Sequence, residues 1–246
     1  MTATASPPLN RTALYRKFVA EIATKCGTDP GVRVALRKGL RRSLNDVGPL
    51  HRIVAAWLPE NRSDAEERAF YAVAAMIADR PRHSFNDPDD ETLSEQQTPA
   101  TDTGNEPEAA TEPGETPTTV PQQAVPDRTR RDSLGASFAR AVVAQGGQGG
   151  VREDTAEARL NLLTRQSVDG LHRHLPGSVR LLRGNGSGSG ADVDFAVLLN
   201  DLAGWPQYSK AISRRWLQDF YRVKNAALEA AARRRDSEDE ETANTN

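Results

Sequence analysis

The chain has 246 residues, of which 37% are hydrophobic, and it contains one cysteine. This hydrophobic fraction is below the roughly 45–50% usual for a fully globular protein, so part of the chain is not expected to contribute to a core. A single cysteine excludes an internal disulfide framework, and the longest apolar stretch, residues 69–78, is about half of a membrane-spanning helix. The first ten residues lack the basic and apolar regions of a secretory signal, so we expect a soluble cytoplasmic protein.

The charges of the chain are segregated. The formal net charge is −2, but residues 86–127 carry eleven acidic residues and no Lys or Arg, and residues 236–246 carry five more acids. The remainder holds 18 acidic and all 32 basic residues, a net charge of +14. Residues 86–127 have too few apolar side chains to offset the entropy of ordering the backbone. We predict helical lobes over 1–85 and 131–235, a disordered acidic linker over 86–130, and a disordered acidic tail over 236–246.

Four helices are predicted in the N-terminal lobe, because apolar residues recur there at helical spacing. They are expected over residues 12–26, 31–44, 48–59 and 63–78. The fourth begins with the pattern of a capping box, in which Ser63 and Glu66 each accept a hydrogen bond from the other's backbone N–H.

The second of these helices contains the densest group of cations. Leu36, Leu40 and Leu44 recur at i, i+4 and i+8 and would hold the helix to its lobe. Cations four residues apart on the adjoining faces repel one another unless a polyanion or an acidic partner neutralises them. The basic residues concerned are Arg33, Arg37, Lys38, Arg41 and Arg42.

Five helical segments are predicted in the C-terminal lobe, over residues 133–145, 154–166, 167–184, 193–204 and about 207–235. We expect Asp154 and Asp192 to act as N-caps. Pro176 is expected to divide the third segment into two short helices, and Gly204 to end the fourth. No segment alternates like a strand, so the predicted fold class is all-α, with two helical-bundle lobes.

The last predicted helix has an aromatic row that we interpret as core. Base stacking is the alternative for Trp216, Phe220 and Tyr221. The row itself comprises Tyr208, Ile212, Trp216 and Phe220.

The C-terminal lobe adds further arginines with few acids among them. A solvated helix face is the ordinary explanation of any single arginine, but a soluble surface normally mixes both signs of charge. Arginine rather than lysine also favours phosphate binding through paired N–H groups. We therefore predict that a nucleic-acid-binding surface includes Arg140, Arg159, Arg165, Arg173, Arg180 and Arg183, together with the basic residues of 31–44.

No pattern in the chain indicates catalysis, and we predict no enzyme, metal or cofactor. His172 and His174 are two residues apart and do not face each other on a helix, which leaves a metal-dependent nuclease as a distant alternative. Residues 184–190, GNGSGSG, lack the strand, spacing and lysine of a phosphate-binding loop and are predicted to connect helices. Cys26 has no evident histidine partner and is expected to be a buried thiol.

Seven stretches in this order resemble one family: ALYRKF (13–18), VALRKGLRRSL (34–44), LHRIVAAWLP (50–59), AFYAVAAMIA (69–78), SLGASFARAV (133–142), ARLNLLTRQSVDGLHRHL (158–175) and RRWLQDFYR (214–222). This is the CasB family, the small subunit of the type I-E CRISPR surveillance complex, Cascade. The chain differs from the family pattern in its acidic insert at 86–127 and in GNGSGSG.

The resemblance implies a non-catalytic helical subunit, present as two copies beside the other Cascade subunits. Its basic surface would stabilise the R-loop by contacting the displaced single-stranded DNA and the duplex of guide RNA and target DNA. The positions that match the family's basic patches are Arg37, Lys38, Arg159, Arg165, Arg180 and Arg183. The residues alone leave open another class, a helical protein–protein adaptor whose basic faces bind acidic partners.

Overall fold

The structure confirms the predicted all-α class. The computed structural model describes residues 11–40, 48–80, 132–144, 151–183 and 192–243. Within these ranges no strand occurs. None of the described helices combines the length and the apolarity needed to cross a membrane. The predicted acidic linker, residues 86–130, lies outside the described residues.

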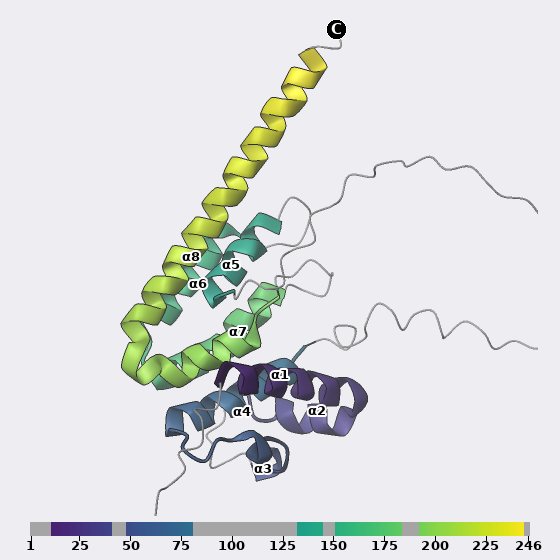
Figure 1. The fold of residues 1–246 in the computed structure, drawn as a ribbon, viewed down its shortest axis with the longest axis vertical. Helices are drawn as coiled ribbons and strands as arrows, with labels where there is room; N and C mark the ends of the chain where they lie inside the picture. The colour runs from purple at the N-terminus through teal and green to yellow at the C-terminus, as the bar shows by residue number, and fades with distance from the viewer. Residues whose placement is uncertain (1–10, 41–47, 81–131, 145–150, 184–191, 244–246) are drawn as a thin grey trace, which may run out of the picture. The chain divides into compact units, whose positions relative to one another are not determined.

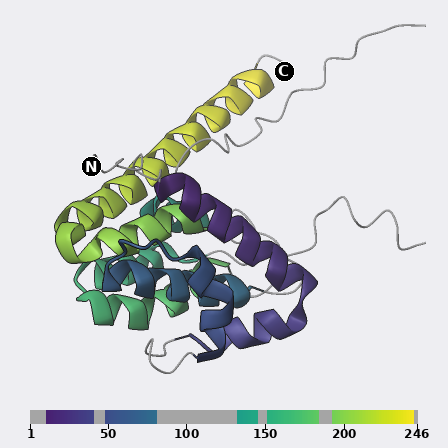
Figure 2. The same ribbon diagram turned by 60° about the horizontal axis from the view of Figure 1, so that its bottom comes forward.

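Figure 1 shows how the helices are arranged. They are α1 (Arg11–Thr28), α2 (Pro30–Arg37), α3 (Gly48–Val54), the 3-10 helix η2 (Ala55–Trp57), α4 (Asp64–Ala78), α5 (Leu134–Val143), α6 (Glu153–Thr164), α7 (Val168–Arg183) and α8 (Phe195–Ala243). The helices that precede and follow the acidic insert belong to one compact unit, in which α1 and α4 pack against α8. Figure 2 shows α1, in purple, from a second direction.

Helix α4 lies at the centre of the N-terminal helices. Its segment 69–78 is buried almost completely, and several alanines in it allow neighbouring helices to approach closely. The ring of Phe70 packs edge-on against Tyr15 and Phe18 of α1, with centroids 5.6 and 4.7 Å away. These aromatic contacts join α1 to α4.

The start of α4 forms only half of the predicted capping box. The Ser63 hydroxyl accepts the predicted bond from the Glu66 N–H at 3.2 Å. The Glu66 carboxylate, however, is buried and turns to α1, where it accepts hydrogen bonds from the Tyr15 hydroxyl at 2.7 Å and from Arg11. A buried carboxylate requires such donors, and α1 lies close enough to supply them.

The prediction that the second helix continues to residue 44 is wrong. Helix α2 ends at Arg37, and the N–H groups of the next three residues bond to carbonyls three residues back. Gly39 allows this tight turn to pack against α3, because a Cβ there would lie 2.4 Å from a methyl carbon of Leu50. Arg41, Arg42 and Leu44 lie outside the described residues, so the three-turn face predicted with Arg33 and Arg37 does not form within α2.

The predicted N-caps of two helices are also wrong, because the observed cap of each helix lies two residues away from the predicted one. Helix α6 begins after Arg152, and Asp154 lies in its first turn, where a carboxylate still complements the helix dipole. Helix α8 is capped by Asp194, which accepts hydrogen bonds from the N–H groups of Ala196 and Val197 at 3.0 Å each. Asp192 instead forms an ion pair with Arg80 at 2.8 Å.

Neither Pro176 nor Gly204 ends a helix. Helix α7 runs unbroken through Pro176, which is buried together with Leu175 and Val179. Helix α8 continues through Gly204 and Pro206 and is interrupted only by non-helical backbone at Tyr208. Tertiary burial of apolar faces therefore outweighs the local preference of these residues to end a helix.

The C-terminal core forms where α8 is covered by α5 and α6. Trp216 and Phe220 are fully buried and Ile212 nearly so, which confirms their interpretation as core and removes two of the three base-stacking candidates. Gly135 of α5 lies directly against the α8 backbone, and a Cβ there would be 1.8 Å from the Trp216 carbonyl oxygen. Beyond this core α8 continues to Ala243, through most of the segment predicted as a disordered tail.

Candidate nucleic-acid interface

Two arginines from distant parts of the chain hold the C-terminal end of α4. Arg33 of α2 donates to the carbonyl oxygens of Ala78 and Arg80 at 3.2 and 2.6 Å. Arg183 of α7 donates to the carbonyl oxygen of Met76 at 3.1 Å. The last carbonyl groups of a helix lack partners inside the helix and form the negative end of its dipole, so both cations are favourably placed.

Asp79, directly after α4, is shared by two further arginines. Its side chain is only 6% exposed. Arg180 of α7 binds one carboxylate oxygen through two nitrogens at 2.6 and 3.1 Å, and Arg37 of α2 lies 3.4 Å from the other oxygen. A carboxylate at the negative end of a helix is unfavourable by itself, and the two guanidinium groups compensate for it.

Arg80 completes this group. It pairs with Asp192, and its guanidinium carbon lies 5.2 Å from the centre of the Phe195 ring. Arg183 contacts the same ring at 5.3 Å. Burial and the nearby charge of Arg80 lower the pKa of Arg183 to about 10, so this guanidinium remains charged at neutral pH.

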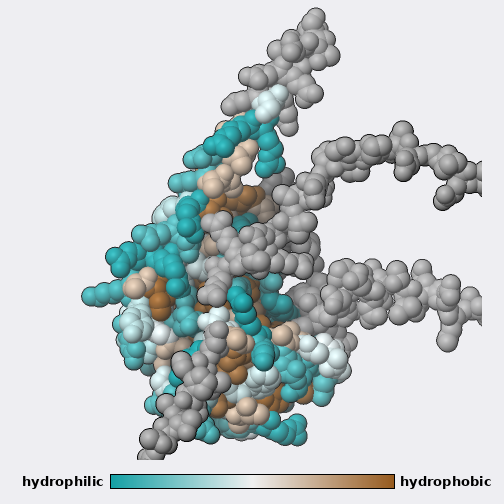
Figure 3. Space-filling model, in the orientation of Figure 1, coloured by the Kyte–Doolittle hydropathy of each residue, from teal (hydrophilic) through white to brown (hydrophobic). Residues whose placement is uncertain are grey.

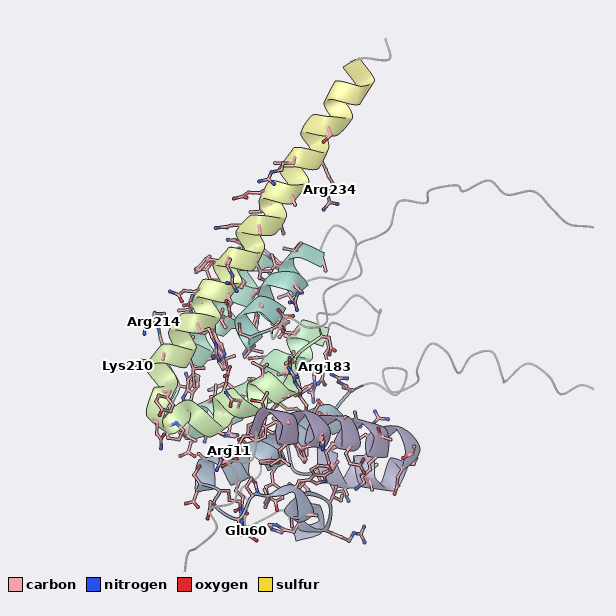
Figure 4. All side chains as sticks on the ribbon, in the orientation of Figure 1. Arg11, Glu60, Arg183, Lys210, Arg214 and Arg234 are labelled. Carbon is pink, nitrogen blue, oxygen red and sulfur yellow. The ribbon has the colours of Figure 1, made fainter. Side chains whose placement is uncertain are left out.

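We call these residues the arginine cluster. It contains more cations than anions and is built from α2, the end of α4, α7 and the segment before α8. Figure 4 shows Arg183 at the end of α7, on the side that faces the N-terminal helices. The cluster comprises Arg33, Arg37, Arg80, Arg180, Arg183, Asp79 and Asp192.

The structure thus brings together four of the residues predicted to bind nucleic acid. Arg33, Arg37, Arg180 and Arg183 come from both predicted lobes and meet in the arginine cluster. Their roles in it differ: the side chains of Arg37 and Arg180 are 51% and 62% exposed, whereas Arg183 is largely covered. The first two can reach a ligand in solvent, and Arg33 and Arg183 chiefly support the helix end.

The other predicted residues lie outside the cluster. Arg140, in the last turn of α5, forms an ion pair with Asp132, which precedes the helix. Arg41 and Arg42 lie outside the described residues. The remaining four are exposed and form no side-chain hydrogen bond or ion pair with any described residue: Lys38, Arg159, Arg165 and Arg173.

Sequence reasoning missed Arg80, Asp79 and Asp192. The signal available for the first two was their position directly after the long apolar run of α4, where a cation is favoured and an acid needs a partner. The partners themselves could not be identified, because Asp79 and Arg180 are 101 residues apart in the chain. Asp192 was interpreted as a helix cap, which concealed its pairing with Arg80.

His172 and Cys26 are parts of the packed structure, whereas His174 is partly exposed. His172 is 8% exposed, and burial lowers its pKa to about 4, so it is neutral at pH 7. The described residues contain no group of three or more His, Cys, Asp or Glu side chains able to hold a metal ion. Cys26 is buried as expected, and this burial raises the pKa of its thiol to about 11.

The described residues form an all-α structure in which exposed arginines and lysines lie on several helices. Figure 3 shows hydrophilic residues along much of the α8 side of the face in view. The family model described as CRISPR-associated protein Cse2 matches residues 32–221. The chain belongs to this family, which is the CasB family that the sequence resembles.

Solved structures agree with the family assignment. A chain of a structure described as a CRISPR RNA-guided surveillance complex is 29% identical to this chain, with a TM-score of 0.65. The similarity covers 90% of this chain and 99% of that chain. A second structure, described as such a complex in a pre-nicking state, gives the same identity and TM-score over 89% and 98% of the two chains. No curated protein matches the chain.

Proposed function

We propose that this chain is a non-catalytic small subunit of a type I-E CRISPR RNA-guided surveillance complex. Its basic surface stabilises the R-loop by binding the displaced non-target strand and the backbone of the guide–target duplex. Two copies of the chain bridge neighbouring subunits of the complex, which acts in the cytoplasm against invading DNA.

The observation that carries this proposal is the arginine cluster and its exposed neighbours. Arg37 and Arg180 converge from distant parts of the chain and remain about half exposed. Lys38 follows Arg37 in the turn that ends α2 and is also exposed. Several cations at one place suit a surface that binds a polyanion.

The energetics of the R-loop make such a surface useful. The heteroduplex formed is about as stable as the DNA duplex that it replaces, so contacts between protein and backbone can tip the balance. Contacts to phosphates require positive charge and not a base-reading element. The described residues supply this charge, and they contain no group of His, Cys, Asp and Glu side chains that could hold the zinc ion of a base-reading zinc motif.

Charge reversal of Arg37 and Lys38 in the assembled complex tests the proposal. We expect Arg37→Glu with Lys38→Glu to reduce the fraction of target DNA in the R-loop, measured by permanganate reactivity of unpaired thymines in the non-target strand. Arg16→Glu with Lys17→Glu is the matched control, because it reverses an adjacent exposed pair on α1.

The double variant must still assemble into the complex. Native mass spectrometry of the complex checks this assembly and also gives the copy number of the chain. Equal R-loop fractions for the wild type and the Arg37/Lys38 variant would refute the assignment of these two residues. One copy of the chain per complex would refute the proposed pairing of copies.

One observation favours the adaptor as a second candidate function. Arg37 and Arg180 already bind a carboxylate, that of Asp79, so they could equally bind acidic groups of a protein. Electrophoretic mobility shift of random single-stranded DNA with the full chain separates the two functions. An R-loop subunit retards the DNA and loses this effect as salt increases, whereas an adaptor does not retard it.

A further inference from the structure

Helix α8 is bent, and the bend has a local cause. Pro206 lies inside the helix, where it has no N–H for a backbone hydrogen bond and its ring displaces the preceding turn. Two residues later the backbone of Tyr208 is non-helical, with φ −124° and ψ 17°. Figures 1 and 2 both show two arms of α8 that meet at a sharp bend. We call them the first arm, residues 195–207, and the second arm, residues 209–243.

One buried carboxylate joins the two arms across the bend. Asp201, in the first arm, is 1% exposed. It accepts hydrogen bonds from two groups of the second arm, the Trp216 indole N–H at 2.7 Å and the guanidinium group of Arg215. The indole rings of Trp205 and Trp216 also meet across the bend, with centroids 5.1 Å apart. A buried carboxylate that loses its donors is costly, so these contacts favour one angle between the arms.

Each arm contacts a different part of the basic surface. The first arm begins with Phe195, and two guanidinium groups of the arginine cluster lie 5.2 and 5.3 Å from the centre of its ring. The second arm holds α6, because Ser213 donates to the Thr164 carbonyl oxygen at 3.1 Å. On α6 and directly after it, Arg159 and Arg165 are exposed. The angle of the bend therefore helps to set the spacing between the arginine cluster and these two arginines.

We propose that Asp201 is a positioning residue for the basic surface. By holding the bend, it keeps the arginine cluster and the two α6 arginines at one spacing, so that a single strand occupies both places at the same time. Asp201 itself is buried and acts only through the bend. Two linked contacts give one strong site only when their spacing matches the ligand, because the second contact then forms at a high effective concentration. The inference rests on the proposed function and adds to it a residue that contacts no nucleic acid.

Packing of α5 also holds the two arms, but it does so less specifically. Gly135 of α5 lies against the Trp216 carbonyl group in the second arm, and Ser137 donates to the carbonyl oxygen of Asp192, just before the first arm, at 3.2 Å. Apolar side chains pack over a range of angles, whereas hydrogen bonds to a carboxylate weaken steeply when their geometry changes. A buried ion pair is also weak evidence for stability, because apolar residues of similar volume often stabilise a core as well or better. We therefore assign to Asp201 the choice of one bend angle.

Glu66 provides a matched control, because it is the same kind of group at another place. It is also 1% exposed, and it accepts hydrogen bonds from the Tyr15 hydroxyl at 2.7 Å and from Arg11. These contacts join α1 to α4 and do not cross the bend of α8. Asp201→Asn and Glu66→Gln each remove one buried charge, and both should lower the thermal midpoint. Of the two, Asp201→Asn alone should release the bend.

Double electron–electron resonance on the full chain measures the effect on the bend. Spin labels at Val34→Cys on α2 and Ala158→Cys on α6 occupy exposed sites on the two sides of it. We expect one narrow distance distribution in the otherwise wild-type chain and in Glu66→Gln, and a broader or shifted one in Asp201→Asn. Arg215→Gln weakens the same contact from a side chain that is 46% exposed, so it should fold and broaden the distribution even if Asp201→Asn does not fold.

Fluorescence anisotropy with oligothymidine strands of increasing length measures the effect on binding. A short strand occupies one contact surface, so Asp201→Asn should bind it within about two-fold of the wild type. A long strand bridges the arginine cluster and the α6 arginines. For this strand we expect Asp201→Asn to lose about five-fold or more in affinity, whereas Glu66→Gln should retain the affinity of the wild type.

Each other outcome overturns a particular statement. Unchanged distances in Asp201→Asn, or in Arg215→Gln if the former does not fold, refute the control of the bend. Equal losses of long-strand affinity in Asp201→Asn and Glu66→Gln, equal losses for short and long strands, or no loss at all refute the positioning role, while the proposed function stands. If the wild-type chain binds no strand of any length and Arg37→Glu with Lys38→Glu leaves the R-loop unchanged in the complex, the proposed function itself fails.

Discussion

Asp79 is the residue whose replacement tests the arginine cluster most directly. It holds Arg37 and Arg180, the two cluster arginines that remain half exposed, and its own side chain is nearly buried. The Asp79 carboxylate pairs with both guanidinium groups, so phosphates of a bound nucleic acid must compete with it for them. Asp79→Asn keeps the shape of the side chain and one hydrogen-bond acceptor but removes the charge.

The size of the effect follows from Coulomb's law. A carboxylate roughly 7 Å from a bound phosphate repels it by about 0.6 kcal/mol at the dielectric constant of water, and by about 2 kcal/mol at an effective value near 20. Removing that charge should therefore tighten binding of single-stranded DNA about three-fold to thirty-fold at low salt. Screening reduces the difference as the ionic strength rises. The unfolding free energy should fall by only about 1 kcal/mol, because both arginines are solvated when released.

Fluorescence anisotropy with a labelled oligonucleotide, repeated over a range of salt concentrations, measures this change. Asp219→Asn is the matched control, since Asp219 is also mostly covered, pairs with Arg222 on α8 and lies outside the cluster. Equal gains in affinity for the two variants would mean that the effect comes from the change in net charge alone and not from the position of Asp79. A loss of affinity in Asp79→Asn at an unchanged thermal midpoint would show that Asp79 orients the arginines, and would refute competition.

Two further predictions concern stability. Gly135→Ala should destabilise the fold by about 3 kcal/mol, because its Cβ would overlap the Trp216 carbonyl oxygen and force α5 away from α8, whereas Gly48→Ala, with open space around it, should be neutral in urea unfolding. The pKa of His172 is lowered to about 4 by burial, with a contribution from Arg68, so the unfolded chain binds more protons between about pH 4 and 6.5. The unfolding free energy should fall by up to about 3 kcal/mol as the pH decreases through this window, and His172→Gln should remove most of that dependence.

Most helices could be predicted from the sequence because their signals are local. The apolar spacing that defines α1 and α4 depends on residues within one or two turns, and so does the cap formed by Ser63. The interpretation of Trp216 and Phe220 as core was likewise correct, since a continuous apolar row on a long helix is normally covered.

The errors lie where a local preference was opposed by packing. Pro176 was expected to break α7, but the apolar residues on both sides of it are buried on one face, which holds the helix together. Glu66 was expected to complete a capping box, but donors from α1 bind its carboxylate instead. Contacts of this kind join residues far apart in the chain, and no short pattern contains them.

The sequence by itself determined the helical class, the excess of positive charge outside the acidic segments and the resemblance to a family, because composition and spacing carry these properties. Only the tertiary structure decided which cations are available. Arg183 and Met76 are 107 residues apart, yet their contact makes this arginine a support of α4. The reverse holds for Tyr208, which the helical row assigns to the core and the kink at Pro206 turns outward. Charge is a property of the residue, whereas its availability depends on what the fold places beside it.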